Sequence, residues 1–341
     1  MDPLKHHLLE QAEANRWINR QWWQALEKLS VAELDQPQGG FFGSIWGTWN
    51  HVLLTDRLWL GRVIEQPFAI KSLGDRLCDT KAQFQQERVV TDQAWIDAIA
   101  QDADVARTMT YRNSKGVEFH TPLYQALQHL FMHQAHHRAQ LHQMCSERKI
   151  ALSDGGLIGF YRSHDVGPAV MGGDASLLRR VLTEQAAANH FINREWWGAL
   201  KDLPLADLDQ PQGAFFGSIF GTWNHLLLGD RIWLGRLAGR PLPFVKLSDR
   251  ITHTVSEFLE ERERTDHALM DQVAAEPDVT RVLVYRGNQG QPYETPLYRV
   301  FQHMFAHQAH HRGQIHQMCD ERKIALPDGG LIGYYRTRQT A

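Results

Sequence analysis

The chain of 341 residues has little of what marks membrane, secreted or nucleic-acid-binding proteins. Its three cysteines, Cys78, Cys145 and Cys319, are too few for a disulfide scaffold and fit a reducing compartment such as the cytoplasm. No run approaches the ~18 apolar residues of a membrane span, and the N-terminal residues carry no apolar signal segment. Lys and Arg (36) nearly balance Asp and Glu (39), so bulk charge does not favour nucleic acid. We therefore expect a cytoplasmic protein with no membrane or nucleic-acid partner.

What the sequence does contain is an ordinary globular composition with one exception. Hydrophobic residues make up 43% and charged residues 22%, which is typical of folded soluble domains. Histidine is the exception, with 19 residues. The histidines are therefore the first candidates for functional residues.

The chain consists of two copies of one unit. Residues 41–51 return as 215–225, and residues 121–162 return as 295–336, with a constant offset of 174 and no gap. A unit of this size is a duplicated domain, because solenoid repeats are far shorter. We predict one domain at 1–165, a Gly- and Pro-containing linker at 166–174, and a second domain at 175–341.

Hydrophobic periodicity predicts an all-α fold of two tandem four-helix bundles. Thr121-Pro122 is a typical helix start and is expected to cap the last helix of the first copy. The Gly-rich tail from Ser153, including Asp154-Gly155-Gly156, is predicted to be a turn with no helix after it. The elements predicted for the first copy are helices at 4–29, 43–65, 75–101 and 121–148, and a short hairpin or extended loop at 108–120.

Several histidines of the last helix share one face, at the edge of its apolar stripe. His133 and His137 are four residues apart, so both imidazoles can reach one metal ion from a single helix. His142 lies roughly opposite and is predicted to be solvated. The residues within about 100° of one another on the helical wheel are His129, His133, His136, His137 and Gln140.

The second helix supplies a candidate third ligand. His51 shares a face with the apolar residues of that helix, and Gly43 and Gly47 are expected to leave space beside it. Three neutral imidazoles would leave a fourth position open, which is typical of catalytic metal sites. We expect one divalent ion per domain; Zn²⁺ suits such a site best, and Ni²⁺ and Fe²⁺ also bind imidazole. The predicted metal ligands are His51, His133 and His137 in the first copy, and His225, His307 and His311 in the second.

Structural interpretations compete with this one. A core histidine is more often a packing residue than a ligand, and a recent duplication alone could explain the paired histidines. Trp22, Trp23, Trp49 and Trp59 are predicted to be core or bundle-interface residues, in preference to substrate-stacking groups. Asn15 and Asn19, with Asn189 and Asn193 in the second copy, either hydrogen-bond in the core or line the site. Cys145 and Cys319 are interpreted as inert thiols.

Two motifs together resemble the DinB/YfiT-like family. The first is His51 followed by Asp56-Arg-Leu-Trp59-Leu60, and the second is His133-Gln-Ala-His136-His137-Arg-Ala139-Gln140. Both recur in the second copy, beginning at His225 and His307. The second copy has the Gly that is usual in this motif, Gly313, whereas the first departs from it with Ala139. The resemblance covers nearly the whole of each copy.

The resemblance implies an up-down-down-up helix order and a metal bound by the six histidines named above, with His136 and His310 as non-ligands. Relatives include transferases and isomerases that use bacillithiol, mycothiol or glutathione. They often form homodimers, so a tandem chain is expected to be an intramolecular pseudo-dimer.

Taken together, these patterns lead to two functional hypotheses. The first is a metal-dependent transferase or isomerase that activates a thiolate or water against a small-molecule substrate. Gln140 and Gln314 are candidates to fix an imidazole N–H, whereas Asp56 and Asp230 are expected to serve packing or an Arg pair. The second is a non-catalytic metal-binding or scaffold protein, which a fourth protein ligand or a site plugged by Trp or the tail would favour.

Overall fold

The computed structural model describes residues 2–113, 115–153, 156–164, 173–240, 242–243, 246–327 and 330–338. Most of these residues are helical, which confirms the predicted all-α fold of two domains. The predicted linker at 166–174 lies almost wholly outside the described residues. Among the described helices, none combines the length and apolar character needed to cross a bilayer.

The first half contains four long helices and a hairpin among its described residues. The predicted hairpin is confirmed, with β1 and β2 antiparallel. Thr121, the predicted helix cap, instead pairs with Met109 in this hairpin, so the last long helix begins two residues later. The elements are α1 (Pro3–Leu26), α2 (Val31–Leu34), α3 (Ile45–Val63), α4 (Lys81–Gln101), β1 (Thr108–Arg112), β2 (Glu118–Pro122), α5 (Leu123–Glu147) and α6 (Leu157–Ser163).

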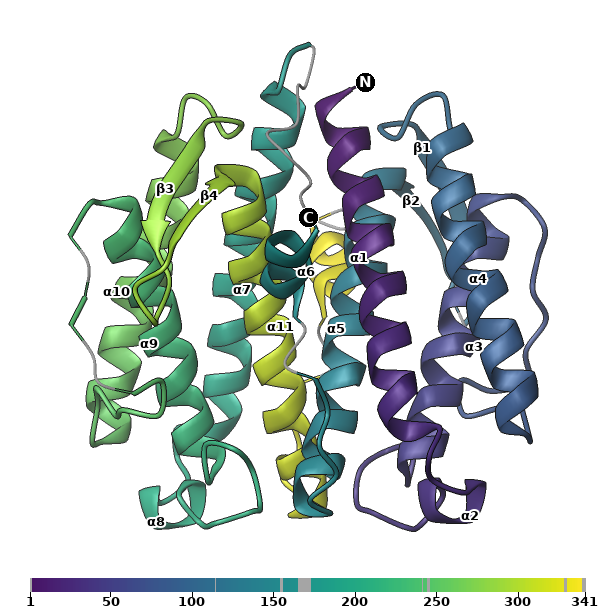
Figure 1. Ribbon diagram of the computed structural model, residues 1–341, viewed down its shortest axis with the longest axis horizontal. Helices are drawn as coiled ribbons and strands as arrows, with labels where there is room; N and C mark the ends of the chain where they lie inside the picture. The colour runs from purple at the N-terminus through teal and green to yellow at the C-terminus, as the bar shows by residue number, and fades with distance from the viewer. Residues whose placement is uncertain are drawn as a thin grey trace.

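The second half repeats this order, and the two halves stand side by side with their last long helices adjacent at the centre (Figure 1). Within each half the long helices pack on one another, and the first helix of each also reaches the other half. The elements are α7 (Ser176–Leu200), α8 (Leu205–Leu208), α9 (Ile219–Leu237), α10 (Val255–Ala275), β3 (Val282–Arg286), β4 (Pro292–Pro296), α11 (Leu297–Glu321) and α12 (Leu331–Thr337).

The turn before α3 differs from the prediction. Gly43 is not helical; it has a positive φ of 73° in the turn that precedes the Ser44 cap. A Cβ on Gly47 would lie 2.2 Å from the carbonyl oxygen of Phe42. At Gly47 the expected space is therefore taken by the backbone of Phe42, whereas a Cβ on Gly43 would meet no atom within 4 Å.

The Gly-rich tail also differs from the prediction, because a short helix, α6, follows it. Leu157, Phe160 and Tyr161 lie at helical spacing and are buried in a cluster with Ala14 of α1. The helix packs between α1 of its own half and α11 of the other half. Its apolar face therefore depends on the other half for cover. Asp154 and Gly155 lie outside the described residues.

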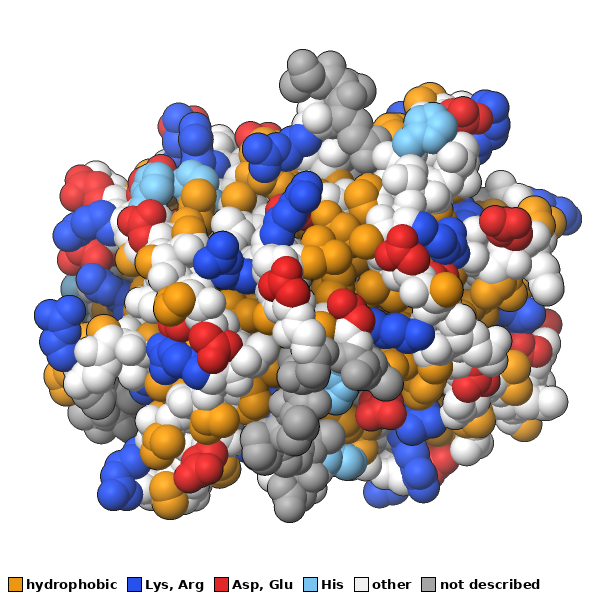
Figure 2. All heavy atoms as spheres, turned by 90° about the horizontal axis from the view of Figure 1, so that it is seen from above, with side chains coloured by type: hydrophobic (Ala, Val, Ile, Leu, Met, Phe, Trp, Pro, Cys, Tyr) orange, Lys and Arg blue, Asp and Glu red, His pale blue; other side chains and the backbone are white. Residues whose placement is uncertain are grey.

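The two halves share a hydrophobic core. One cluster joins Leu8 of α1 and Leu127 of α5 to Leu182 of α7 and Phe301 of α11. The tryptophans predicted to be core residues are all buried (Trp22, Trp23, Trp49 and Trp59). Outside this core, charges of both signs are intermixed over the face in Figure 2, around a central hydrophobic region.

Buried polar contacts also cross the boundary. Glu10 of α1 forms an ion pair with Arg299 of α11 and accepts a hydrogen bond from Tyr298 at 3.0 Å. Because a buried charge is costly unless it is paired, these contacts favour one docking geometry of the halves.

Candidate metal centres

The structure brings each predicted set of three histidines together. His51 of α3 and His133 and His137 of α5 offer one nitrogen each, and these atoms lie within 4.8 Å of one another. The Nε2 atoms of His133 and His137 are 3.0 Å apart. In the second half, the same arrangement is formed by His225, His307 and His311. We call these the first and second trio.

Hydrogen bonds to acceptors fix the orientation of the outer imidazoles. Nδ1–H of His51 donates to the carbonyl oxygen of Leu73 at 2.9 Å, and Nδ1–H of His137 donates to Oε1 of Gln140 at 2.6 Å. A carbonyl can only accept, so the proton sits on Nδ1 and the Nε2 lone pair faces the trio. The role predicted for Gln140 is confirmed, whereas Leu73 carries no sequence signal.

The second trio uses the same contacts, and it shows why the nitrogens fit a cation. His225 and His311 donate through Nδ1 to Leu247 and Gln314, at 2.8 Å and 2.6 Å. Their Nε2 lone pairs then point at Nε2 of His307, from 3.2 Å and 3.1 Å. A single proton on His307 can satisfy one of these lone pairs at a time, whereas a divalent cation satisfies all three nitrogens.

Burial keeps the trios neutral. It lowers the pKa of His51 and of His225 to about 4. It also lowers the pKa of the four trio histidines that lie on α5 and α11 well below the usual value. A neutral imidazole is the form that binds a metal ion. At neutral pH each trio therefore presents three uncharged donors.

An aromatic ring, missed from the sequence, covers each trio. Phe42 stacks on His51 with ring centroids 3.8 Å apart, and Phe216 stacks on His225 at the same distance. The Phe rings come from the turns that precede α3 and α9. The repeated segment Phe-Phe-Gly-Ser-Ile was the available signal, but only the folded turn shows that its second ring lies over a histidine.

A buried polar network holds α5 beside α3. Asp56 pairs with Arg88 of α4 at 2.5 Å and accepts a hydrogen bond from Gln134 at 3.0 Å. Arg138, the residue after His137, donates to Asn15 at 2.7 Å. The predicted Arg pair of Asp56 is thus confirmed, and Asp230 forms the same pair with Arg262 in the second half.

The asparagines that the sequence left open between core and site are members of this network. Asn19 donates to Asp92 at 3.1 Å and accepts from Arg138 at 3.0 Å. Asn15 also lines a cavity, as described below. The cysteines lie apart from the trios: Cys145 and Cys319 are buried, and burial raises the pKa of each thiol to about 12.

Four further histidines of α5 and α11 pair between the two halves. Nε2 of His136 lies 3.0 Å from Nδ1 of His316, and Nδ1 of His142 lies 3.3 Å from Nε2 of His310. The prediction that His142 is solvated was therefore wrong. The helix face that carries it would be exposed in an isolated bundle, but here it packs against α11.

Each trio opens into a cavity that the other half completes. The first cavity, of about 270 Å³, is lined by His133 and His137 and, from the second half, by Asn189, Trp196 and Arg312. The second cavity, of about 400 Å³, is lined by the whole second trio and by side chains of the first half. The first-half side chains include Asn15, Trp22, Arg138 and Leu157.

Within the described part of the chain, each trio stands as a set of three ligands. Among the described residues, no further His, Cys, Asp or Glu joins either group. The Trp and tail residues line the cavities without filling them. An exchangeable fourth position facing a cavity is the arrangement that distinguishes a reactive metal site from a closed structural one.

The two cavities differ at two pairs of equivalent positions, of which one is Pro327 in the first cavity against Ser153 in the second. Met132 lines the first cavity. The equivalent residue of the second half is Ala306, which lines the second cavity. Met132 also reaches the second cavity. Ala306 has a shorter side chain than Met132 and so takes up less space at its place in the wall.

Comparison with known families identifies the chain. A model of the DinB family matches residues 4–147 and again residues 179–322, so the chain belongs to this family as a tandem duplication. Two such domains in one chain fit an intramolecular pseudo-dimer, and each three-histidine group could hold a metal ion. Comparison with curated proteins and with solved structures gave no match.

Proposed function

We propose that this DinB-family protein binds one divalent metal ion at each trio and works as a metal-dependent transferase or isomerase with a low-molecular-weight thiol. The observation that carries the proposal is the convergence of three imidazole Nε2 atoms at the wall of a cavity. His51, His133 and His137 would hold the ion in the first half, and His225, His307 and His311 in the second. Zn²⁺ suits this donor set best, and Ni²⁺ and Fe²⁺ also fit imidazole ligands.

The neutrality of the ligands decides the chemistry. An ion bound by three neutral imidazoles keeps its full positive charge and lowers the pKa of a coordinated thiol or water, which yields a nucleophile at neutral pH. Gln140 and Leu73 hold two of the imidazoles in the binding tautomer. Phe42 covers His51 and keeps water from that side.

The cavity walls fit a small, partly apolar substrate. Ile192, Trp196 and Phe305 form an apolar wall in the first cavity, and Asn189 adds a polar group. At about 400 Å³ the second cavity lies at the lower end of the range for small-molecule sites, and at about 270 Å³ the first lies just below it. Because Asn189 and Trp196 belong to the second half, the first site requires both halves.

The alternative is a non-catalytic metal-binding or scaffold protein, which the shared core and the buried ion pair between the halves would also serve. The cavities beside both trios favour the enzyme. A screen of low-molecular-weight thiols against electrophilic substrates distinguishes the two, since a scaffold turns over none of them.

Metal analysis of the purified protein tests the first step. We expect two tightly held divalent ions per chain in the wild type, and none in His133→Ala plus His307→Ala. His120→Ala, a change in the exposed part of β2, is the control and should keep both ions. A wild type that stays metal-free in excess Zn²⁺, Ni²⁺ and Fe²⁺ would overturn the proposal.

A further inference from the structure

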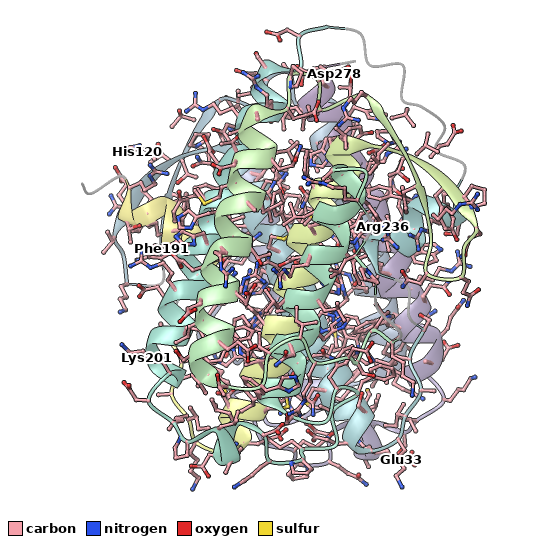
Figure 3. The ribbon with its side chains drawn as sticks, turned by 90° about the vertical axis from the view of Figure 1, so that its left-hand side faces the viewer. Glu33, His120, Phe191, Lys201, Arg236 and Asp278 are labelled. Atoms are coloured by element: carbon pink, nitrogen blue, oxygen red, sulfur yellow. The ribbon has the colours of Figure 1, made fainter. Side chains whose placement is uncertain are left out.

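A third group of metal-binding side chains lies on the surface of the second half. His190 of α7 and Glu263 and His267 of α10 each offer a ligand atom within 4.8 Å of the others. Nε2 of His190 is 3.7 Å from a carboxylate oxygen of Glu263, and the two imidazole centroids are 4.9 Å apart. Figure 3 looks onto α10, the light-green helix facing the viewer, and labels Phe191, the residue after His190.

Each imidazole has an oxygen acceptor behind it, and that of His267 is within hydrogen-bonding distance. Nδ1–H of His267 donates to the backbone carbonyl of Glu263 at 3.0 Å, which leaves Nε2 as the donor atom for a cation. Nδ1 of His190 faces the buried carboxylate of Asp266 at 3.7 Å. A carboxylate or carbonyl behind a ligating imidazole is the usual outer partner in metal sites, because it fixes the tautomer and strengthens the donor.

The surrounding charge also favours a cation. Glu263 and the buried Asp266 place two carboxylates beside His190, each with an oxygen 3.7 Å from an imidazole nitrogen, so this spot attracts positive charge. Glu263 and His267 are one helical turn apart on α10 and therefore project side by side. Two imidazoles and one carboxylate form a donor set typical of Zn²⁺ and related ions.

The first half provides an internal comparison. The positions equivalent to His190, Glu263 and His267 are Arg16, Val89 and Gln93. There, Arg16 donates a hydrogen bond to Gln93 at 2.7 Å, so a guanidinium supplies the positive charge. The buried residues beneath, Arg88 and Asp92, are the same in both halves. The metal-binding side chains are thus a feature of the second half alone among these equivalent positions.

We propose that His190, Glu263 and His267 form a third divalent-metal site that clamps α7 to α10, separate from the trios. Ligand atoms around a tetrahedral Zn²⁺ lie about 3.4 Å apart. The Glu263 and His267 side chains are about half exposed, so each can turn toward His190 to reach that spacing. Water completes the coordination, so this site binds more weakly than the trios and exchanges faster.

Equilibrium dialysis with Zn²⁺ at pH 7.5 tests the site by counting ions. The wild type should bind two ions tightly and a third with at least tenfold weaker affinity. His190→Arg plus His267→Gln installs the pair that the protein itself uses at Arg16 and Gln93. It should lose the third ion and keep the first two. A third ion that persists in this variant overturns the proposal.

Two further measurements keep the result unambiguous. Glu263→Gln changes a half-exposed side chain and serves as the test if the double variant fails to fold. It should weaken binding of the third ion about tenfold. The wild type should also show selective shifts of the His190 and His267 ring resonances in NMR as the third ion is added. Shifts elsewhere with these two unchanged would place the ion at another site and refute the assignment.

Discussion

Gly313 of α11 lies against the backbone of His136 in α5, so closely that a Cβ on Gly313 would be 2.2 Å from the His136 carbonyl oxygen. Ala139 is the equivalent residue of the first half and lies at the same contact. Its Cβ would be 2.9 Å from a Cβ on Gly313. The Gly of one motif and the Ala of the other therefore fit each other where α5 packs on α11.

Gly313→Ala should force the central helices apart. Overpacking of a tight core contact typically costs about 1–3 kcal/mol, so we expect a loss of that size in the free energy of unfolding, measured in urea. Ala139→Gly is the matched control and should cost less than about 1 kcal/mol, the usual helix penalty of glycine. Equal losses in both variants would argue against the steric explanation.

Gln140→Ala should weaken metal binding at the first trio by about 10–100-fold, because His137 loses the acceptor that fixes its tautomer. The second trio should be unaffected. Gln314→Ala should give the mirror result, since Gln314 serves His311. Competition with a chromophoric chelator measures both affinities. The prediction fails if either variant weakens both ions alike.

The metal-free protein should lose stability as pH falls below about 6.5. Histidines of the unfolded chain take up protons near that pH, whereas His51 and His225 take them up only near pH 4 in the folded state. Their contribution is therefore complete above pH 6.5 and declines as the pH falls toward 4. Each such histidine should cost about 1.4 kcal/mol per pH unit in this window.

Thermal unfolding of the metal-free protein between pH 7.5 and 4.5 measures this decline. His51→Gln should reduce the dependence of stability on pH by the contribution of one histidine. His120→Ala, at an exposed position, should not change its slope. A stability that is constant down to pH 5 would contradict the burial of neutral imidazoles.

Ala306→Met should narrow the second cavity toward the size of the first, since Met132 occupies the equivalent position there. We expect larger thiols to bind more weakly to the variant, while small thiols and both metal ions bind as in the wild type. Calorimetric titration with thiols of graded size checks this. Unchanged selectivity would show that Ala306 does not limit the cavity.

Much of the candidate site could be predicted from local pattern. The His133–His137 spacing, the inward face of His51 and the Gln140 contact all follow from helical geometry, because residues three or four apart share a face. The duplication likewise follows from the repeat alone. The helix α6 was not predicted, because seven residues are too few to show a helical period. Its apolar side chains are buried by contact with α11 of the other half, which the local sequence does not reveal.

The sequence by itself determined the helices, the two copies and the histidines that gather in each. Only the tertiary structure decided what surrounds them: the Leu73 carbonyl behind His51, the Phe42 ring over it, and the walls that each half lends to the cavity of the other. The physical reason is distance along the chain. A backbone carbonyl has no residue identity, and a helix face predicted to meet solvent can instead meet a second domain, which is why His142 lies in an interface.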